Sequence, residues 1–277
     1  MGNLLGVLNP IALKIGAIEI HWYGIIIATA VVLAVLLSVN EGKKRGLKED
    51  YFYDFLLWAL PFSIIAARTY YVVFQWSYYS QHLNQIYRIW DGGIAIYGSL
   101  LGALAVLLIF CKRNNISSWL FLDVIAPTVI LAQGIGRWGN FMNQEAHGRP
   151  TTLAFLNSLH LPEFIVQQMH INGIYYQPTF LYESVWDILG FILIISLRHK
   201  SGLFKQGEVF FTYVIWYSFG RFFIEGMRTD SLMLGSLRVS QWLSLVFFVG
   251  AIAWWAYRRY WNPLNDWYLD AGIKTEK

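Results

Sequence analysis

The sequence is poor in charge and in cysteine, and both shortages narrow the class of protein. Charged residues make up 14% of the 277 residues, whereas a soluble domain usually carries about 25%. The single Cys111 excludes an intramolecular disulfide framework, a multi-cysteine zinc site and an iron–sulfur cluster. The net charge of +4 is modest and nothing in the chain resembles a basic nucleic-acid-binding arm.

Several catalytic and cofactor-binding patterns are also missing from the sequence. It has no HExxH motif, and none of its six histidines lies well inside an apolar run. An intramembrane metalloprotease or a Ser–His protease would therefore lack its base. The last apolar run has no lysine for a retinal Schiff base. We expect neither a metal nor a cofactor.

Apolar and aromatic residues dominate the chain. Hydrophobic residues make up 56%, and 13 Trp, 17 Tyr and 19 Phe suit rings that lie at two membrane interfaces. Because a membrane helix needs about 20 apolar residues, we expect an all-α integral membrane protein with seven transmembrane helices in a single polytopic domain, 1–277. The expected spans are 21–39, 51–74, 93–111, 118–135, 179–197, 207–225 and 239–257.

Two segments outside these spans have distinct expected roles. Residues 1–20 lack a basic signal-peptide region and contain Pro10 and Lys14, so we expect a retained amphipathic arm on the membrane surface. Residues 136–178 are long for a loop in a compact bundle and predict an external head region between the fourth and fifth spans.

The distribution of Lys and Arg predicts the orientation of the chain. Basic residues concentrate on cytoplasmic loops, and an odd number of spans would then place the N-terminus and residues 136–178 outside. Thirteen of the 21 basic residues fall on the side that we expect to be cytoplasmic: Lys43, Lys44, Arg45, Lys48, Lys112, Arg113, Arg198, Lys200, Lys205, Arg258, Arg259, Lys274 and Lys277.

A polar stripe marks the sixth expected span. Tyr217, Arg221, Glu225 and Arg228 are spaced by four, four and three residues, which places them on one helical face. Ions inside a membrane span are candidates for function. Two guanidinium groups and one carboxylate would leave positive charge for an anion, whereas a purely structural Arg221–Glu225 pair is the alternative interpretation.

The residues that end the fourth span form a second polar group. Glycines in the segment 134–148 would permit tight turns and close approach of backbone to a ligand. Arg137 suits a phosphate, while Asn140 and Asn143 suit hydroxyl groups, with Glu145 as an acceptor. The alternative is a loop that plugs the bundle with internal hydrogen bonds.

Three further positions carry weaker signals. Tyr23 opens the first span and is typical of an interface anchor. Arg68 requires a partner whatever its role. Tyr97 would act in proton transfer only with an altered pKa or within a relay.

Other polar and small residues favour structural roles. Gly98 and Gly102 form a pair typical of close helix packing. Asp123 lies towards the cytoplasmic end of its span and is interpreted as structural. Glu183 and Asp187 stand one turn apart in the fifth span.

Several separated motifs follow one another along the chain: His21-Trp-Tyr-Gly24, Arg68-Thr-Tyr-Tyr71, Gly92-Gly-Ile-Ala-Ile-Tyr-Gly98, Gly136-Arg-Trp-Gly-Asn-Phe-Met-Asn-Gln-Glu-Ala-His-Gly148, Gln177-Pro-Thr-Phe-Leu-Tyr-Glu183 and the stretch from Tyr217 to Arg228. In sequence and in order, these motifs resemble those of the prolipoprotein diacylglyceryl transferase family of bacteria. The resemblance covers nearly the whole chain and implies seven transmembrane helices in the bacterial cytoplasmic membrane, with the N-terminus outside and the C-terminus in the cytoplasm.

The resemblance also implies a reaction and a set of site residues. The diacylglyceryl group of phosphatidylglycerol would pass to the lipobox cysteine thiol of a preprolipoprotein, and glycerol 1-phosphate would leave. Many family members have His where this chain has Tyr97, so the proton acceptor stays open between Tyr97 and Tyr217. The expected catalytic residues are Arg137, Arg221, Tyr97, Tyr217, Glu145 and Glu225, and the expected substrate-binding residues are Arg137, Asn140, Asn143, Gly148, Tyr23, Arg68 and Arg228.

Two other classes of function fit the same residues. A lipid-binding or transport protein would use the arginines to hold an anionic lipid without chemistry. A scaffolding membrane protein would pair its charges only with one another, so that swapping Arg221 and Glu225 together would have mild effects.

Overall fold

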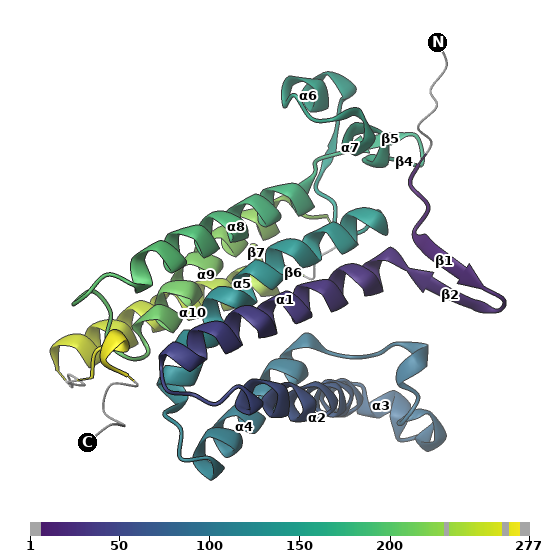
Figure 1. Ribbon diagram of the computed structural model, residues 1–277. Coiled ribbons are helices and arrows are strands. Elements are labelled where there is room, and N and C mark those ends of the chain that lie inside the picture. Colours follow the sequence, from purple (N-terminus) through teal and green to yellow (C-terminus); the bar gives the residue numbers. More distant parts are fainter. Residues whose placement is uncertain (1–6, 230–232, 262–265, 272–277) are drawn as a thin grey trace. The chain divides into compact units, whose positions relative to one another are not determined.

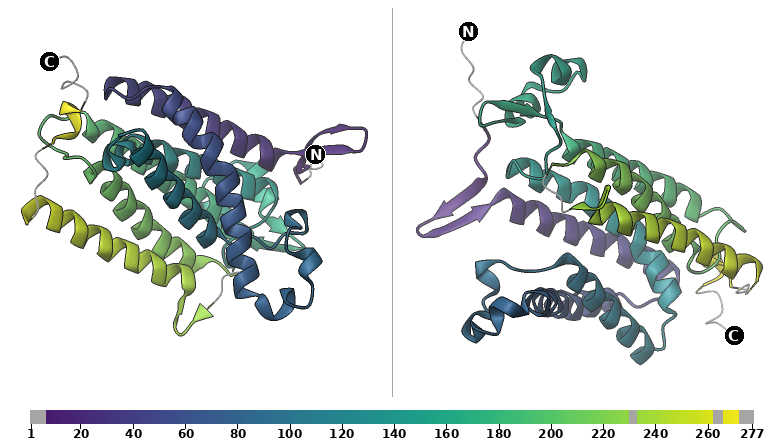
Figure 2. Two further views of the ribbon diagram at one scale, coloured as in Figure 1. Left: turned by 90° about the horizontal axis from the view of Figure 1, so that it is seen from below. Right: turned by 180° about the vertical axis from the view of Figure 1, so that it is seen from behind.

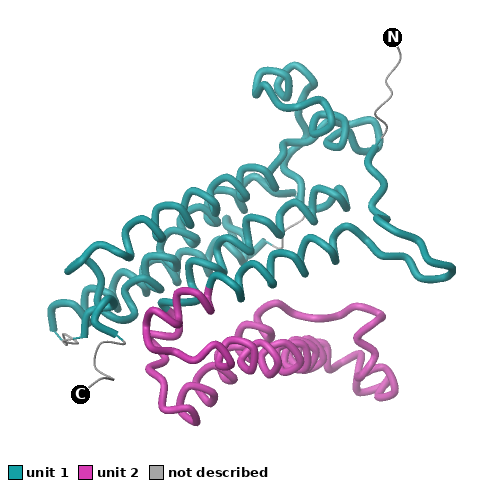
Figure 3. The backbone as a smooth tube through the Cα atoms, viewed as in Figure 1, with its two compact units in different colours: residues 1–37, 123–271 teal, residues 38–122, 272–277 magenta. Residues whose placement is uncertain are grey.

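The chain is mostly helical and divides into two compact units. The computed structural model describes residues 7–229, 233–261 and 266–271, so Lys274, Lys277 and the first six residues of the expected arm lie outside the described residues. Unit 1 comprises residues 1–37 and 123–271, and unit 2 comprises residues 38–122 and 272–277 (Figure 3).

Six of the described helices are long and apolar enough to cross a membrane, which indicates a multi-pass membrane protein. They are α1 (Trp22–Lys44), α2 (Asp50–Phe74), α4 (Ile96–Arg113), α5 (Ser118–Met142), α8 (Thr179–Arg198) and α10 (Val239–Tyr260). The segment expected as the sixth span is α9 (Glu208–Met227), a helix of 20 residues that is not among these six. Long apolar faces of the spans are exposed, as Leu57 and Val246 illustrate.

The helices of unit 1 run side by side, with α9 packed against α8 and α10 (Figures 1 and 2). Half of the apolar stretch of α5 is buried, against 17% for α1 and α10, so α5 is the most enclosed of the six. Its glycines lie against neighbouring helices. A Cβ at Gly134 would meet Asp187 of α8 at 3.2 Å, and one at Gly136 would meet Ile27 of α1 at 3.2 Å.

The fourth span is longer than expected. It was predicted to end at residue 135 and to continue as a glycine-rich loop with tight turns, but α5 extends to Met142. The prediction of a loop over 136–142 is therefore wrong. A glycine costs about 1 kcal/mol in a helix relative to alanine, but here the absent side chains make room for α1 and α8, and tertiary packing offsets the low helix propensity.

Two tryptophans fix the register of α8 against α9. Trp186 and Trp216 stack with ring centroids 4.3 Å apart, and each indole N–H donates to the backbone carbonyl of the other residue at 3.0 Å. Each ring fills the space over a glycine of the opposite helix, since a Cβ at Gly190 would lie 2.4 Å from Trp216 and one at Gly220 would lie 2.1 Å from Trp186.

Asp123 of α5 caps the N-terminus of α9. Its carboxylate accepts hydrogen bonds from the backbone N–H groups of Gly207 at 2.5 Å and Phe210 at 2.8 Å. The first N–H groups of a helix have no partner within the helix, so a carboxylate from another helix satisfies them. The structural interpretation of Asp123 is confirmed.

The N-terminal arm is a β-hairpin, so the all-α prediction is wrong in this part of the chain. Strands β1 (Ile11–Ile15) and β2 (Ile18–His21) pair antiparallel and lead directly into α1. β-Branched isoleucines favour a strand, and Gly16 turns the chain with a φ of +60°. Lys14 and Glu19 pair across the strands at 2.6 Å.

Residues 143–178 between α5 and α8 form a small head with its own hydrophobic core. Short strands and helices make up the head: β3 (Pro150–Thr151), α6 (Leu153–Ser158), α7 (Glu163–Gln168), β4 (His170–Ile171) and β5 (Ile174–Tyr176). The three strands form one sheet in the order β3-β5-β4. The buried core joins the head to the ends of α5 and α8 through Phe141, Leu156, Ile165, Val166, Met169 and Phe180. A further hairpin, β6 (Met233–Leu234) and β7 (Leu237–Arg238), precedes α10, and the turn η3 (Tyr268–Asp270) follows it.

Unit 2 is built on the antiparallel pair α2 and α4. The segment between them contains α3 (Trp76–Tyr79), η1 (Leu83–Gln85) and η2 (Ile89–Asp91). Gly98 and Gly102 of α4 lie against α2, where added Cβ atoms would stand 2.5 Å from the Ala66 carbonyl oxygen and 2.7 Å from the Ala66 Cβ. This confirms the prediction that the glycine pair marks close helix packing.

Candidate functional site

Two arginines from different helices share one buried carboxylate in unit 1. Glu183 of α8 is 3% exposed. Arg137 of α5 approaches it with Nη2 at 3.0 Å from Oε1, and Arg221 of α9 donates from Nη1 to both Glu183 oxygens at 2.9 Å. The three helices therefore converge on one ionic centre, which we call the arginine cluster: Arg137, Glu183 and Arg221.

The stripe expected on α9 is partly present. Arg221 pairs with Glu225 one turn later through Nη2 and Oε2, and Tyr217 lies one turn earlier. Arg228 does not continue the stripe, because α9 ends at Met227 and Arg228 has an extended backbone with ψ of 156°. Its carbonyl accepts a hydrogen bond from Arg238. The four-residue helical stripe is therefore corrected to three residues.

The surplus of positive charge expected from α9 alone is not found. Glu183 comes from α8 and neutralises part of the charge, so Arg137 and Arg221 together face Glu183 and Glu225. Spacing along one helix cannot reveal a partner on another. Glu183 was not among the expected site residues, although it ends one of the family motifs and a carboxylate inside a span is itself a signal of function.

A chain of amides joins the arginine cluster to the exposed loop after α5. Arg137 donates to the Asn140 side-chain oxygen at 3.4 Å, and Asn140 donates to Glu145 at 2.9 Å. Asn143 donates to the same Glu145 oxygen at 3.4 Å. Gln144 and Ala146, on either side of Glu145, have φ of +53° and +57°. Non-glycine residues rarely adopt this conformation, so the loop holds Glu145 at a backbone cost.

Two more expected residues border this region. The ring of Tyr23 lies over α5, where a Cβ at Gly139 would stand 2.7 Å from it. Gly148 is buried, and a Cβ there would meet Gln177 at 2.8 Å and Thr179 at 2.9 Å. Its N–H donates to the Gln177 carbonyl at 2.9 Å. The structure thus gives Gly148 a packing role between the loop and the start of α8.

A second set of polar residues lies one to two turns along the same helices from the arginine cluster. Asp187 of α8 is fully buried, and neither of its oxygens has a hydrogen-bond partner among the residues that the structure describes. Tyr213 donates to the Gln133 side chain at 3.3 Å, and its ring stacks on Tyr217 with centroids 6.0 Å apart. Tyr213 and Gln133 were not anticipated; both stand one turn before a residue that was, Tyr217 and Arg137 respectively.

Arg68 and Tyr97 belong to unit 2. Arg68 is 6% exposed, and its guanidinium donates four hydrogen bonds of 2.7–2.8 Å to backbone carbonyls of the α3–α4 segment. The acceptors are Gln85, Ile86, Gly92 and Gly93. Tyr97 opens α4 and meets the ring of Tyr70 edge-on, with centroids 6.4 Å apart.

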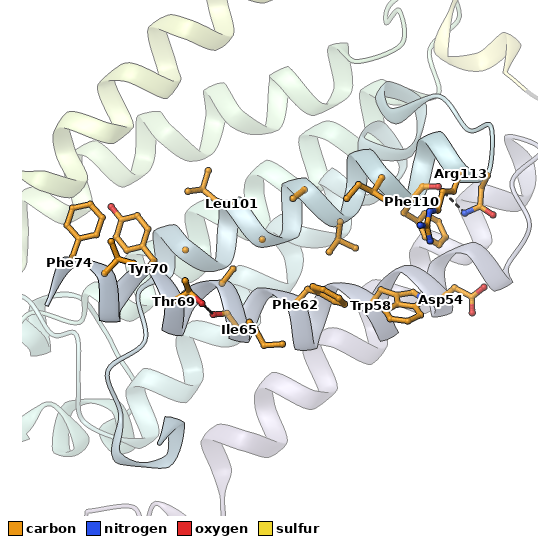
Figure 4. A pocket seen from close by; sticks show the side chains of 18 residues that line it. Asp54, Trp58, Phe62, Ile65, Thr69, Tyr70, Phe74, Leu101, Phe110 and Arg113 are labelled. Carbon is orange, nitrogen blue, oxygen red and sulfur yellow. Dashed lines mark hydrogen bonds between the residues drawn. The ribbon is translucent and has the colours of Figure 1, made fainter. Parts of the chain in front are cut away.

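Unit 2 also carries an apolar groove along α2 and α4 (Figure 4). Its volume is about 930 Å³. Asp54 and Arg113 lie at one end and Tyr70 and Phe74 at the other (Figure 4), with apolar side chains such as Leu101 between them. Such a lining suits contact with lipid chains, which offer no hydrogen bonds.

The fold and the arginine cluster define a multi-pass membrane protein with a buried centre of guanidinium and carboxylate groups. A family model described as prolipoprotein diacylglyceryl transferase matches residues 10–257. The chain belongs to the prolipoprotein diacylglyceryl transferase family.

Relatives named phosphatidylglycerol--prolipoprotein diacylglyceryl transferase match along almost the full chain. One from Ligilactobacillus salivarius is 69% identical over 97% of this chain and 100% of its own length. Another from Pediococcus pentosaceus is 66% identical over 94% of this chain and 93% of its own. A third from Lactiplantibacillus plantarum is 63% identical over 97% and 96%.

Proposed function

We propose that this protein transfers the diacylglyceryl group of phosphatidylglycerol to the lipobox cysteine of preprolipoproteins, the first step of bacterial lipoprotein maturation. The observation that carries the proposal is the convergence of Arg137 and Arg221 on Glu183, in a chain whose relatives bear the name of this activity. Phosphatidylglycerol and a preprolipoprotein are its partners, and the reaction needs no metal or cofactor.

The arginines bind and stabilise phosphate. In the reaction, the thiol sulfur bonds to the glycerol carbon of the diacylglyceryl group while the bond from that carbon to a phosphate oxygen breaks. Glycerol 1-phosphate leaves with the phosphate. A guanidinium group can donate two parallel hydrogen bonds to two oxygens of one phosphate. Positive groups that are already in place stabilise the negative charge that develops on the leaving group. The buried Nε–H of Arg137 has no hydrogen-bond partner among the described residues and is available as a further donor.

The amide chain and the adjoining loop bind the glycerol headgroup. Asn140 and Asn143 offer donors and acceptors for hydroxyl groups, and Glu145 orients both amides. Tyr23 borders the same end of α5. Glu225 orients Arg221, and Gly148 keeps the loop close to α8.

Two expected arginines take supporting roles. The guanidinium of Arg68 already donates hydrogen bonds to four backbone carbonyls. We therefore assign Arg68 to holding the α3–α4 segment rather than to binding phosphate. Arg228 lies just beyond α9 and contributes positive charge near the end of the helix that carries Arg221.

In this proposal the thiol proton leaves through a tyrosine relay, in which the phenol oxygen accepts the thiol proton while the phenol's own proton passes to the phosphate of the leaving glycerol 1-phosphate. The nucleophile is the thiolate, which is far more reactive than the thiol. Tyr217 lies on α9 one turn before Arg221, on the same face of the helix. We therefore favour Tyr217, and Tyr217→Phe and Tyr97→Phe variants compared at equal expression test the choice.

The membrane arrangement that we propose has seven spans, with the N-terminus outside and the C-terminus in the cytoplasm of a bacterial cell. It includes α9, whose ions Arg221 and Glu225 pair inside the protein. The excess of Lys and Arg at one set of helix ends supports this orientation.

The test is thiol-dependent release of glycerol 1-phosphate from phosphatidylglycerol by the purified protein. A lipobox peptide should support release, and the same peptide with Cys→Ser should not. Arg137→Ala and Arg221→Ala should abolish release in folded protein, while Arg88→Ala, a change in a surface pair with Asp91, should retain it. Binding of phosphatidylglycerol without release of glycerol 1-phosphate, whichever peptide is present, would favour the lipid-carrier function instead.

A further inference from the structure

Asp187 is a fully buried carboxyl group to which the proposed reaction assigns no role. It lies one turn after Glu183 on α8, with 0% of its surface exposed. Neither oxygen has a hydrogen-bond partner within the described ranges 7–229, 233–261 and 266–271. Buried polar groups are nearly always hydrogen-bonded, so an unpartnered carboxyl beside a charged cluster needs an explanation.

Charged and titratable groups surround Asp187 on its own helix and on both helices packed against it. Gly134 brings α5 close, since a Cβ there would stand 3.2 Å from the Asp187 Cβ. The groups that interact electrostatically with Asp187 are Arg137 from α5, Glu183 from α8, and Tyr213, Tyr217 and Arg221 from α9.

The charges of the site are already balanced without Asp187. Arg137 and Arg221 face Glu183 and Glu225, so two positive charges meet two negative ones. A third carboxylate with no hydrogen-bond donor would be costly in a buried site. A proton on Asp187 removes that cost and leaves a neutral group next to the arginines.

We propose that Asp187 holds a proton and that retention of this proton is coupled to binding of the lipid phosphate at Arg137 and Arg221. The phosphodiester adds one negative charge to a balanced site, so the site binds it more tightly while Asp187 is neutral. Where Asp187 has lost its proton, lipid binding draws one from solution. Asp187 is a positioning residue that acts through the arginine cluster, and this inference rests on the proposed function.

The first experiment compares kcat and KM for phosphatidylglycerol across about pH 6 to 9 in the wild type and in Asp187→Asn, which is permanently neutral. In the wild type, KM should rise as Asp187 loses its proton, by up to about tenfold per pH unit, the limit for one proton. In Asp187→Asn, KM should stay low and flat.

The matched control is Asp50→Asn, the same change at an exposed carboxylate at the start of α2, which should keep the wild-type profile. A wild-type profile in folded Asp187→Asn would overturn the proposal. Release of glycerol 1-phosphate by the wild type tests the proposed function separately, because absence of release at every pH would defeat that function and not the proton coupling.

A second measurement needs no variant. Wild-type protein in weakly buffered detergent is mixed with phosphatidylglycerol micelles, without peptide, and the pH is followed with an indicator dye against a detergent blank. Binding should take up protons on the alkaline side, where Asp187 has lost its own. Binding without proton uptake at any pH from about 6 to 9 would overturn the coupling.

Discussion

At the scale of single residues, Glu183 is the position on which the two arginines depend. It stands about 3 Å from both Arg137 and Arg221. Without its charge, two guanidinium groups would face one another in a buried site, and breaking a buried ion pair by removing one partner costs about 3–5 kcal/mol.

Glu183→Gln should therefore lower both stability and activity. We expect a loss in the range of about 3–5 kcal/mol in the free energy of unfolding and a fall in kcat of about 10²-fold, because misplaced arginines no longer stabilise the leaving group. Thermal unfolding and glycerol 1-phosphate release measure the two effects. Glu163→Gln alters an exposed carboxylate that accepts a hydrogen bond from Gln167 of its own helix and should change neither.

Arg68 offers a second test at this scale. Lysine has three donors on a flexible stem, and it cannot reproduce the planar fork of arginine. Arg68→Lys should lose some of the four carbonyl contacts and destabilise the protein by about 2 kcal/mol. Limited proteolysis between residues 80 and 95 should become faster, whereas Arg88→Lys at the exposed pair with Asp91 should leave it unchanged. Equal proteolysis of both variants would argue against the structural role.

At the scale of elements, Trp186 of α8 and Trp216 of α9 stack and hydrogen-bond to each other. This contact fixes the position of Glu183 along the helix axis relative to Arg221. Gly220→Ala would force a Cβ to within 2.1 Å of the Trp186 ring, which is overpacking and typically costs about 1–3 kcal/mol. The helices would have to shift, so we expect activity to fall along with the unfolding temperature.

The matched control for this change is Gly250→Ala. Gly250 also lies in a helix, α10, but a Cβ there meets nothing within 4 Å. Alanine is favoured over glycine in a helix by about 1 kcal/mol, so this variant should be as stable as the wild type or more so. Destabilisation of both variants to the same degree would show that α8–α9 register is not the cause.

The elements also show what the sequence could predict. Long apolar runs identified the helices, and pairs such as Gly98 and Gly102 identified close packing, because both are properties of one continuous segment. The end of α5 was missed because several glycines in a short stretch are typical of a loop. Their role in helix packing becomes visible only in the structure, where Asp187 lies against Gly134 and Tyr23 against Gly139. The N-terminal hairpin was missed because its strands are only five and four residues long, and the first of them does not alternate strictly between polar and apolar residues.

The site was predictable to a similar degree, and for similar reasons. Arg137, Asn140, Asn143 and Glu145 lie close in sequence and also form one hydrogen-bonded chain. The bridge from Arg137 to Arg221 through Glu183 joins three helices, and no spacing along a single helix contains that information. The position of Arg228 depended on where α9 ends, and helix ends are difficult to place from sequence alone.

At the scale of the whole molecule, the single cysteine gives a direct test of orientation. Cys111 is buried and is the single cysteine of the sequence. A Cys111→Ala background therefore leaves no native thiol to label. In that background, Ser158→Cys places a thiol on the exposed head and Ser201→Cys places one at the opposite end of unit 1, between α8 and α9. A membrane-impermeant maleimide should label Ser158→Cys in intact cells and Ser201→Cys only after permeabilisation. The reverse pattern would invert the proposed orientation.

The hydrogen bonds of Gln168 have a consequence for the order in which the protein is completed during synthesis. Gln168 accepts from the backbone of Leu8 at 2.8 Å and donates to the Phe141 carbonyl at 3.2 Å, and so ties the N-terminal arm to the end of α5. Leu8 and Gln168 are 160 residues apart, and at a translation rate of about 5–20 residues per second the second follows the first by about 8 to 32 s. The segment around Leu8, which precedes β1, can therefore dock on the head only after Gln168 has been synthesised. The part of the chain that is made first thus completes its contact with the head late in synthesis.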